Sequence, residues 1–156
     1  MNIRIIAVGK TKENYVKSAT EEYIKRLSPF YNLSIEEIPA EQINDENLYE
    51  KYKKIEGEKI LSKIKNDSFV ITLEIQGKSL SSEEFAEKLK EITSQGVNEI
   101  CFVIGGANGL HSEVSKKADL KLSFSKMTFT HQMIRILLTE QIYRAAKINA
   151  NEKYHR

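Results

Sequence analysis

Residues 99–110, EICFVIGGANGL, join an apolar run to three closely spaced glycines. The run from Glu99 to Ile104 predicts a strand buried on both faces, as in a parallel sheet covered by helices on both sides. The segment from Gly105 to Leu110 then follows the carboxyl end of that strand, where parallel sheets bind ligands. Its glycines let the backbone approach a flat or bulky ligand closely. A tight strand-to-helix turn without a ligand is the alternative.

Strands and helices alternate on both sides of this segment. Apolar runs predict four further strands, at residues 2–8, 33–38, 68–75 and about 120–124. Apolar residues at helical spacing predict helices at 13–28, about 48–64, 81–96, from about 112, and 131–148. Ser81 and Glu84 form a capping-box pattern at the start of the third helix. We therefore expect one α/β domain over residues 1–156, with a parallel sheet between two helical layers.

Length and charge restrict the kind of protein. The 156 residues suit one domain, and no repeat, low-complexity stretch or linker divides them. A formal net charge of +2 is small for a protein that binds naked nucleic acid through many phosphates. Local basic clusters near both ends leave that role open, with a solvated mixed-charge surface as the alternative. They comprise Lys10, Lys12, Lys17, Lys25 and Arg26, and Arg144, Lys147, Lys153 and Arg156.

No segment predicts export or a membrane. The apolar N-terminal run is too short for a signal sequence, and no window approaches the ~20 apolar residues that span a bilayer. We therefore expect a soluble, cytoplasmic protein with no membrane partner. The single Cys101 lies in an apolar strand, so a buried, unreactive thiol is expected. No spacing of His, Cys, Asp and Glu resembles a metal site, and no metal is expected.

Two other irregular segments also follow strands and are expected beside the glycine-rich one. They are Gln76 to Leu80 and Phe124 to Thr130. The second carries two phenylalanines and a methionine, which suit the walls of an adenine-sized pocket. A plain connection between strand and helix is the alternative. Gly9-Lys10-Thr11 mimics the end of a Walker A loop, but Arg4 stands where the first glycine would fall.

The last helix and the tail carry the remaining candidates. Met133 to Tyr143 form an apolar arc wider than one core face requires, which predicts a subunit interface, with deep burial as the alternative. The closing Tyr154-His155-Arg156 combines a stacking ring, an imidazole and a phosphate-binding group. These three residues are expected to add little to the core. His111 is expected near a helix start, and His131 beside the pocket.

Four ordered motifs and the terminus resemble the RlmH family. They are Ile71 to Lys78, Phe102 to Gly106 with Asn108-Gly109-Leu110, Leu122 to Phe129 with His131-Gln132-Met133 and Arg135, and the closing Tyr154-His155-Arg156. Ile6 to Lys10 and Glu37-Ile38-Pro39 fit as well, so the resemblance covers essentially the whole chain. The family commonly has proline before the histidine of the last loop, where this chain has Thr130.

This resemblance implies a homodimeric SPOUT methyltransferase, whose three-layer α/β fold carries a C-terminal trefoil knot. It implies methyl transfer from S-adenosylmethionine to N3 of a pseudouridine in 23S ribosomal RNA of the assembled 70S ribosome. The positions carried over as cofactor-binding are Leu73, Gly105, Phe124, Ser125, Lys126, Met127, Thr128 and Phe129. Gly77 and Gly106 are expected to shape the same cleft. His131, Tyr154, His155 and Arg156 are the expected catalytic residues.

The chemistry of the implied reaction assigns tasks to these side chains. N3 of the base carries a proton that must leave, so an acceptor must lie within hydrogen-bond reach. His155, His131 or ordinary water can serve, while Tyr154 can stack on the displaced base and Arg156 can position phosphate. Two other classes stay open. A nucleotide-binding regulatory domain leaves the tail idle, and a non-catalytic ribosome-associated RNA-binding factor leaves the pocket at Phe124 to Phe129 without a ligand.

Overall fold

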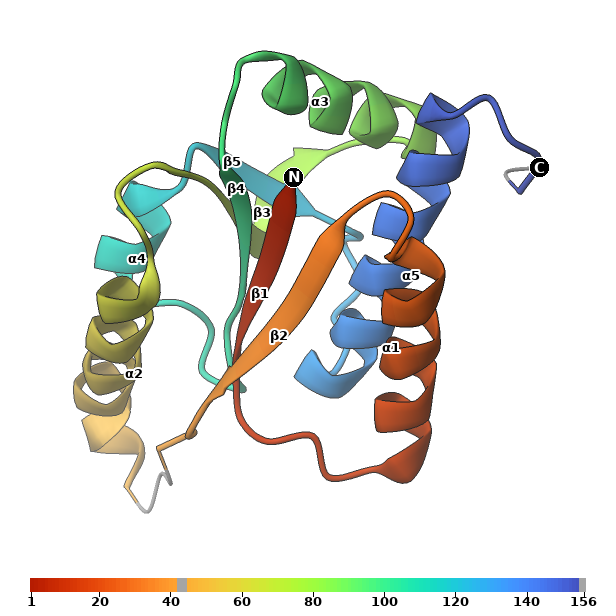
Figure 1. The fold of residues 1–156 in the computed structure, drawn as a ribbon. Coiled ribbons are helices and arrows are strands. Elements are labelled where there is room, and N and C mark those ends of the chain that lie inside the picture. The colour runs from red at the N-terminus through yellow and green to blue at the C-terminus, as the bar shows by residue number, and fades with distance from the viewer. Residues whose placement is uncertain (42–44, 155–156) are drawn as a thin grey trace.

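The computed structural model describes residues 1–41 and 45–154. In this part of the chain five strands form a parallel sheet in the order β2-β1-β4-β3-β5 (Figure 1). The strands are β1 (Asn2–Val8), β2 (Asn32–Ile38), β3 (Ser68–Ser79), β4 (Glu99–Ile104) and β5 (Leu120–Ser123). All six residues of β4 are buried and it lies at the centre of the sheet, as its apolar run predicted.

Helices cover both faces of the sheet, so the three-layer prediction is confirmed (Figure 1). On one face α5 packs against both α1 and α3, and on the other face α2 packs against α4. The helices are α1 (Asn14–Leu27), α2 (Tyr49–Lys63), α3 (Ser82–Ser94), α4 (Ser112–Lys117) and α5 (His131–Asn149). A short 3-10 helix, η1 (Glu46–Leu48), leads into α2.

The sheet separates two apolar cores because side chains alternate along each strand. Ile5 of β1 belongs to the cluster under α1, α3 and α5, whereas the next residue, Ile6, belongs to the cluster under α2 and α4. Both are fully buried. Each fully buried isoleucine contributes roughly 1.5–3 kcal/mol relative to an exposed one, so a central strand buried on both faces holds the layers together.

Local signals in the sequence correctly placed several helix ends. Ser81 Oγ accepts from Glu84 N at 3.0 Å, and the Glu84 carboxylate accepts from Ser81 N at 2.7 Å, which completes the predicted capping box. His111 precedes α4, and its Nδ1 accepts from Glu113 N at 3.2 Å, as expected for a helix start. Gly57 lets α2 approach this site, because a Cβ there would stand 2.9 Å from His111 Cβ.

Strand β3 is longer than the prediction, which ended it at Ile75. Its pairing with β5 shifts register between Leu73 and Lys78, which both align with Leu122. The strand resumes at this point because Gly77 has no side chain: a Cβ there would stand 2.7 Å from the Lys121 carbonyl oxygen. The residues between Leu73 and Lys78 therefore leave the regular pairing at the carboxyl end of β3.

Helix α5 is buried within the chain over its second half. Leu138, Ile142 and Tyr143 lie in the core, whereas Met133 in the first turn is 37% exposed. Deep burial therefore accounts for the apolar arc from Leu138 onward, and only its beginning faces solvent.

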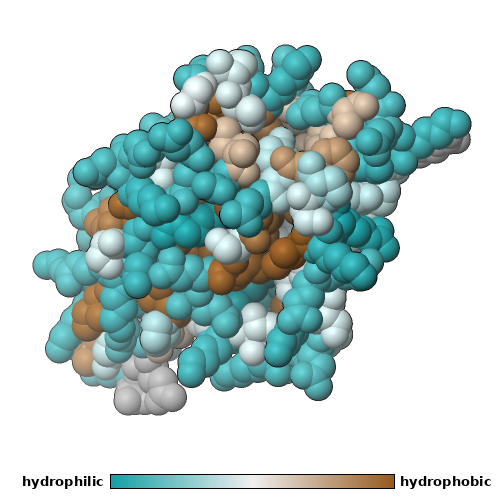
Figure 2. Space-filling view, in the orientation of Figure 1, coloured by the Kyte–Doolittle hydropathy of each residue, from teal (hydrophilic) through white to brown (hydrophobic). Residues whose placement is uncertain are grey.

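The exposed surface is largely polar. The face in Figure 2 is mostly hydrophilic, with a hydrophobic band across its middle.

Cys101 is buried, as its apolar strand predicted, and burial raises the pKa of its thiol to about 12, which suppresses the reactive thiolate. Within residues 1–41 and 45–154, none of the helices combines the length and apolar character needed to cross a bilayer.

Candidate cofactor cleft

A cleft of about 950 Å³ opens at the carboxyl-end edge of the sheet. The irregular end of β3 and the loops after β4 and β5 meet there, as the sequence predicted for the two loops; of the third expected segment, Gln76 to Leu80, only Gln76 lines the cleft, because β3 continues to Ser79. Lys53 of α2 and the start of α5 complete the lining. The lining residues are Lys53, Leu73, Glu74, Ile75, Gln76, Ile104, Gly105, Gly106, Ala107, Gly109, Leu110, Leu122, Phe124, Ser125, Met127, Thr128, Phe129, Thr130, His131 and Ile134.

The glycine-rich loop forms a tight turn on one side of the cleft. Gly109 N donates to the Gly106 carbonyl oxygen at 3.0 Å, and Gly109 has a φ of 76°, a backbone conformation that favours glycine. Gly105 is tightly enclosed, because a Cβ there would lie 3.0 Å from both Gly109 C and Leu110 Cδ2. The absence of a side chain at Gly105 is thus needed by the turn itself, besides any close approach of a ligand.

The opposite side of the cleft is the loop from Phe124 to Thr130. Ser125 Oγ accepts from Met127 N at 2.9 Å, and Ser123 Oγ donates to the Ser125 carbonyl oxygen at 3.2 Å. Thr130 Oγ1 accepts from Met133 N at 3.2 Å and caps α5. Thr130 therefore gives the helix start a side-chain cap that proline, the common family residue, cannot supply.

Most of the expected cofactor residues line the cleft. Leu73, Gly105, Phe124, Ser125, Met127, Thr128 and Phe129 line it, whereas Lys126 is exposed and is not part of the lining. Gly106 lines the cleft too. Gly77 does not line it, but lies where β3 closely approaches the Lys121 backbone. Met127 is 74% exposed, an unusual solvation for a methionine in a monomer.

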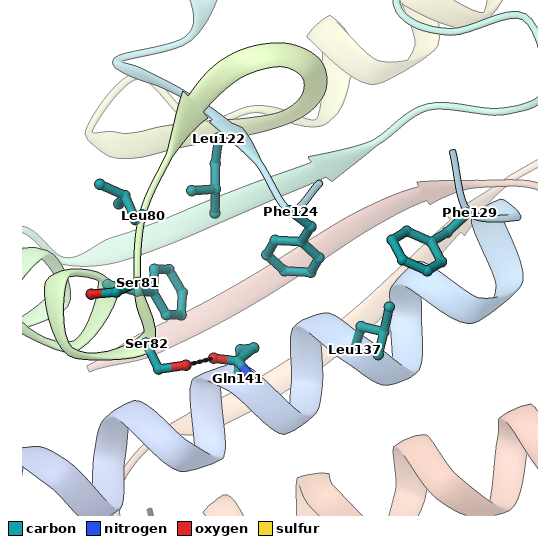
Figure 3. A pocket seen from close by; sticks show the side chains of 9 residues that line it. Leu80, Ser81, Ser82, Leu122, Phe124, Phe129, Leu137 and Gln141 are labelled. Atoms are coloured by element: carbon teal, nitrogen blue, oxygen red, sulfur yellow. Dashed lines mark hydrogen bonds between the residues drawn. The ribbon is translucent and has the colours of Figure 1, made fainter. Parts of the chain in front are cut away.

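A second cavity, of about 240 Å³, lies behind this loop (Figure 3). It shares Leu122, Phe124 and Phe129 with the cleft. In Figure 3 both phenylalanine rings project over α5, near Leu137, and Ser82 Oγ donates to Gln141 Oε1 at 2.8 Å at the other end. The two aromatic side chains therefore stand between the cleft and a small apolar hollow.

Histidine 131 is the first residue of α5, lines the cleft and is half-buried. Its Nε2 lies 3.4 Å from the position that a Cβ on Gly9 would occupy, so the imidazole packs against the backbone after β1. Burial lowers the pKa of His131, and the nearby charges of Arg135 and Lys12 lower it further. Near neutral pH the imidazole is therefore uncharged and able to accept a proton.

Arg135, one turn after His131, is fully buried, and sequence reasoning assigned it no role. Its Nη2 donates to the carbonyl oxygens of Gly9 at 2.6 Å and Val8 at 3.2 Å. Its Nη1 donates to Glu37 Oε2 at 2.7 Å and to Thr11 Oγ1 at 2.8 Å. The available signal was a charged residue inside an apolar helical arc, four residues after a candidate histidine.

Glu56 was also missed. It is buried on α2 behind the glycine loop, with Oε2 accepting from Glu41 N at 2.9 Å. Its other oxygen, Oε1, lies 3.8 Å from the position of a Cβ on Gly106 and has no hydrogen-bond partner among the described residues. Burial raises the pKa of this carboxyl group. The side chain is a support behind the cleft rather than part of its lining.

Tyr154 is not part of the lining of its own chain's cleft. Its ring packs edge-on against Tyr143 with centroids 4.7 Å apart, and its hydroxyl donates to Glu140 Oε1 at 3.3 Å. Burial and hydrogen bonding raise its pKa to about 12. The expectation that the tail adds little to the core is therefore wrong for Tyr154. His155 and Arg156 lie outside the described residues.

Across residues 1–41 and 45–154, no group of three or more His, Cys, Asp and Glu side chains is arranged to hold a metal ion. The polar groups that the cleft offers are loop backbone, the hydroxyls of Ser125, Thr128 and Thr130, His131, and the side chains of Lys53, Glu74 and Gln76. Its apolar residues, such as Leu73 and Phe124, face the same space. This donor set suits an organic cofactor of nucleotide type, held largely by backbone and apolar contact.

An open parallel sheet with a cleft walled by three strand-end loops defines an α/β protein of the cofactor-binding class. Within that class, the chain belongs to the SPOUT methyltransferase family. The family model described as "Predicted SPOUT methyltransferase" matches residues 1–155. Members of this family generally take their methyl group from S-adenosylmethionine.

A solved structure supports the fold. The chain is similar to "a probable methylase family protein from Haemophilus influenzae Rd KW20", with a TM-score of 0.57 and 20% sequence identity. The likeness covers 99% of this chain and 70% of the other. At this identity it bears on the arrangement of the elements alone.

Proposed function

We propose that this SPOUT methyltransferase is of the RlmH type and methylates N3 of a pseudouridine in 23S ribosomal RNA of the assembled 70S ribosome. The observation that carries the proposal is the cleft itself, where the three loops of the family motifs meet and His131 stands at the edge. The modest net charge of +2 suits an enzyme that depends on a large preassembled particle for much of its specificity.

The cleft fits S-adenosylmethionine as the methyl donor. We assign the adenine side to the apolar residues Leu73, Leu110 and Phe124, and the approach of the bent cofactor to the backbone at Gly105 and Gly106. When bound, the cofactor supplies a methyl group already activated by its sulfonium. The chain then contributes alignment of the two reactants and exclusion of water.

His131 is our candidate for the proton acceptor. The imide proton on N3 must leave before or during methyl transfer, and an uncharged imidazole at the edge of the cleft can take it. Water and His155 are the competing acceptors. Methyl transfer by a His131 variant distinguishes His131 from both, because the rate falls only if His131 takes the proton.

We further propose that the enzyme works as a knotted homodimer whose tail completes the partner's site. Helix α5 has 19 residues and so spans about 28 Å at 1.5 Å per residue. It starts at the cleft and runs toward the opposite edge of the sheet (Figure 1). Tyr154 contacts Glu140 and Tyr143, which lie roughly 14–18 Å along the helix from His131, so Tyr154 is away from its own cleft. Exposed apolar side chains at Met127, Phe129 and Met133 support a subunit contact near the loop.

Methyl transfer from labelled S-adenosylmethionine to 70S ribosomes, isolated large subunits and naked ribosomal RNA tests the function. We expect the 70S ribosome to be methylated far better than the other two, with the product mapped to N3 of one pseudouridine by mass spectrometry. Equal rates on all three substrates, or a product on another atom, would contradict the assignment. Calorimetry with S-adenosylmethionine alone separates an enzyme from an RNA-binding factor that has no cofactor.

A mixture of two inactive chains tests the tail. One chain lacks Tyr154, His155 and Arg156, and the other carries Gly105→Val. We expect each alone to lose at least ~10²-fold in methyl transfer, the lower end for a positioned catalytic or orienting group. Mixed heterodimers regain one working site only if the tail acts across the interface. A fully active tail deletion would remove the tail from the mechanism.

A further inference from the structure

The loop between β1 and α1, residues 9–13, is attached to the start of α5 by several hydrogen bonds, although Arg135 Nε and Gln132 Oε1 have no hydrogen-bond partner among the described residues. Arg135 donates to Val8, Gly9 and Thr11, and Gln132 Nε2 donates to the Lys10 carbonyl oxygen at 3.0 Å. From the other side, Gly9 N donates to Ile38 O at 2.6 Å. The loop follows the first strand, carries the Gly9-Lys10-Thr11 motif and is not explained by the cofactor cleft.

The attachment requires a buried cation, which a surface loop does not ordinarily need. Arg135 is 0% exposed, and its only carboxylate partner among the described residues is Glu37. Glu37 also accepts from Thr11 N, so one carboxylate joins the arginine to the loop. Burying a guanidinium is costly unless its geometry is satisfied. The guanidinium is buried, whereas the Glu37 side chain is partly exposed, so a buried cation that donates to Val8, Gly9, Thr11 and Glu37 holds residues 9–11 in one conformation.

The loop presents two exposed lysines, Lys10 and Lys12. Neither forms an ion pair in the described part of the chain. Other exposed lysines, such as Lys90 and Lys117, also lack an ion pair within the described residues, so what distinguishes Lys10 and Lys12 is the place of their loop beside His131. The two cations of the loop are therefore available to an external anion.

The loop also lies beside the reactive edge of the cleft. His131 packs on Gly9, and Lys12 is close enough to His131 for its charge to act on the imidazole. A base that reaches His131 brings its own sugar-phosphate backbone with it. A loop that packs on His131 and carries two exposed ammonium groups thus suits the phosphates that flank a target nucleotide.

We propose that the β1–α1 loop binds the phosphate backbone of the RNA strand whose base enters the cleft beside His131, with Lys10 and Lys12 as the contacts. The proposal rests on the proposed function, since it takes RNA as the substrate. Arg135 and Gln132 act as positioning residues, because they hold the loop without reaching the RNA.

The test compares Lys10→Gln/Lys12→Gln with a matched control, Lys90→Gln/Lys117→Gln. The control removes the same charge from two exposed lysines, on α3 and α4, that have no ion pair within the described residues. The Michaelis constant and kcat for 70S ribosomes are measured at fixed Mg²⁺ over 50–200 mM KCl, roughly the range over which phosphate contacts weaken strongly. Binding of S-adenosylmethionine is measured beside them by calorimetry.

We expect kcat/KM of the loop variant to fall by roughly 10-fold or more at low salt, mainly through KM, with cofactor affinity unchanged. The slope of log kcat/KM against log salt becomes shallower by about 1.4, because each single-strand phosphate contact contributes about 0.7. Lys10→Arg/Lys12→Arg restores both values. A loop variant equal to the control, or a loss with an unchanged salt slope, overturns the proposal; the latter outcome indicates a protein contact or a structural role.

Co-sedimentation with ribosomes separates failure of the loop proposal from failure of the function. If the wild-type chain sediments with ribosomes but does not methylate them, the proposed function fails, and the salt slope of binding still tests the lysines. If it neither binds nor methylates ribosomes, both proposals fail.

Discussion

The two halves of α5 differ in how they are joined to the rest of the chain. The first half presents His131 to the cleft and uses Gln132 and Arg135 to bind loop backbone. The second half buries Leu138 and Ile142 against α1 and α3. One helix thus provides a polar, specifically oriented end beside the cleft and an apolar end in the core. The difference shows that burial alone does not identify structural residues, because Arg135 is as buried as Leu138.

Removing the buried cation should have the largest effect. Arg135→Met leaves the buried Val8 and Gly9 carbonyl oxygens without their donor and removes one partner of Glu37, so we expect a loss of about 2–4 kcal/mol in the free energy of unfolding. Urea unfolding followed by circular dichroism measures it. Arg26→Met, which breaks an exposed helical pair with Glu22, is the matched control and should change stability little. If Arg135→Met changed the free energy of unfolding as little as Arg26→Met, the hydrogen bonds of the first half of α5 would not stabilise the fold, and the two halves would not differ as described.

The pH dependence of this loss follows from Glu37. Burial acts to raise the Glu37 pKa, but hydrogen bonds from Arg135 and Thr11 outweigh it, and the pKa in the fold is lowered. A lowered carboxyl pKa stabilises the fold above the unfolded value of about 4.3, and that contribution is lost as pH falls through the folded value. The difference between wild type and Arg135→Met should therefore narrow below about pH 4.

A substitution in the glycine loop should affect the cleft more than the core. In Gly105→Val the new side chain meets Gly109 and Leu110 at about contact-limiting distance, so the turn must shift. We expect cofactor affinity, measured by calorimetry, to fall roughly 10–100-fold, because forcing extra carbons into a packed site costs about 1–3 kcal/mol. Ala150→Val, just beyond the far end of α5, is the control that adds two methyl groups away from the cleft. Unchanged affinity in a folded Gly105→Val chain would refute the cleft assignment.

Tyr154 should show the opposite behaviour. Tyr154→Ala removes the ring contact with Tyr143, so we expect a loss of about 1 kcal/mol in stability, typical of an aromatic pair. Tyr154→Phe keeps that contact and should cost less. Thermal unfolding measures both. Because the ring is far from its own cleft, cofactor affinity should stay unchanged; a parallel loss of affinity would show that the two ends of α5 are coupled.

The smallest expected effect is a shift in the pH profile of methyl transfer. Since the pKa of His131 is lowered, its imidazole stays uncharged below its ordinary value of about 6.5, and the acidic limb of the profile should lie below that pH. Lys12→Gln should move the limb upward, because it removes one of the charges that lower this pKa. An acidic limb that persists in His131→Gln would assign the proton to another acceptor.

Much of the fold was predictable because its signals are local. The buried run at Glu99 to Ile104 predicted the central strand, and the capping box at Ser81 predicted the start of α3. The convergence of the loops after β4 and β5 with the end of β3 also followed, since parallel strands bring their carboxyl ends to one edge. The continuation of β3 past Gly77 did not follow, because it depends on the Lys121 backbone of a neighbouring strand.

The sequence by itself determined the order of strands and helices, the loops that carry the site and the family resemblance, since each is a property of contiguous residues. Only the tertiary structure decided the partners of distant side chains. Arg135 reaches Glu37 and Gly9 across more than 90 residues of chain, and no local spacing encodes that contact. For the same reason Tyr154 proved to be a core partner of Tyr143 rather than a free tail residue. A side chain's role depends on what surrounds it in space, and packing brings together residues that the chain keeps apart.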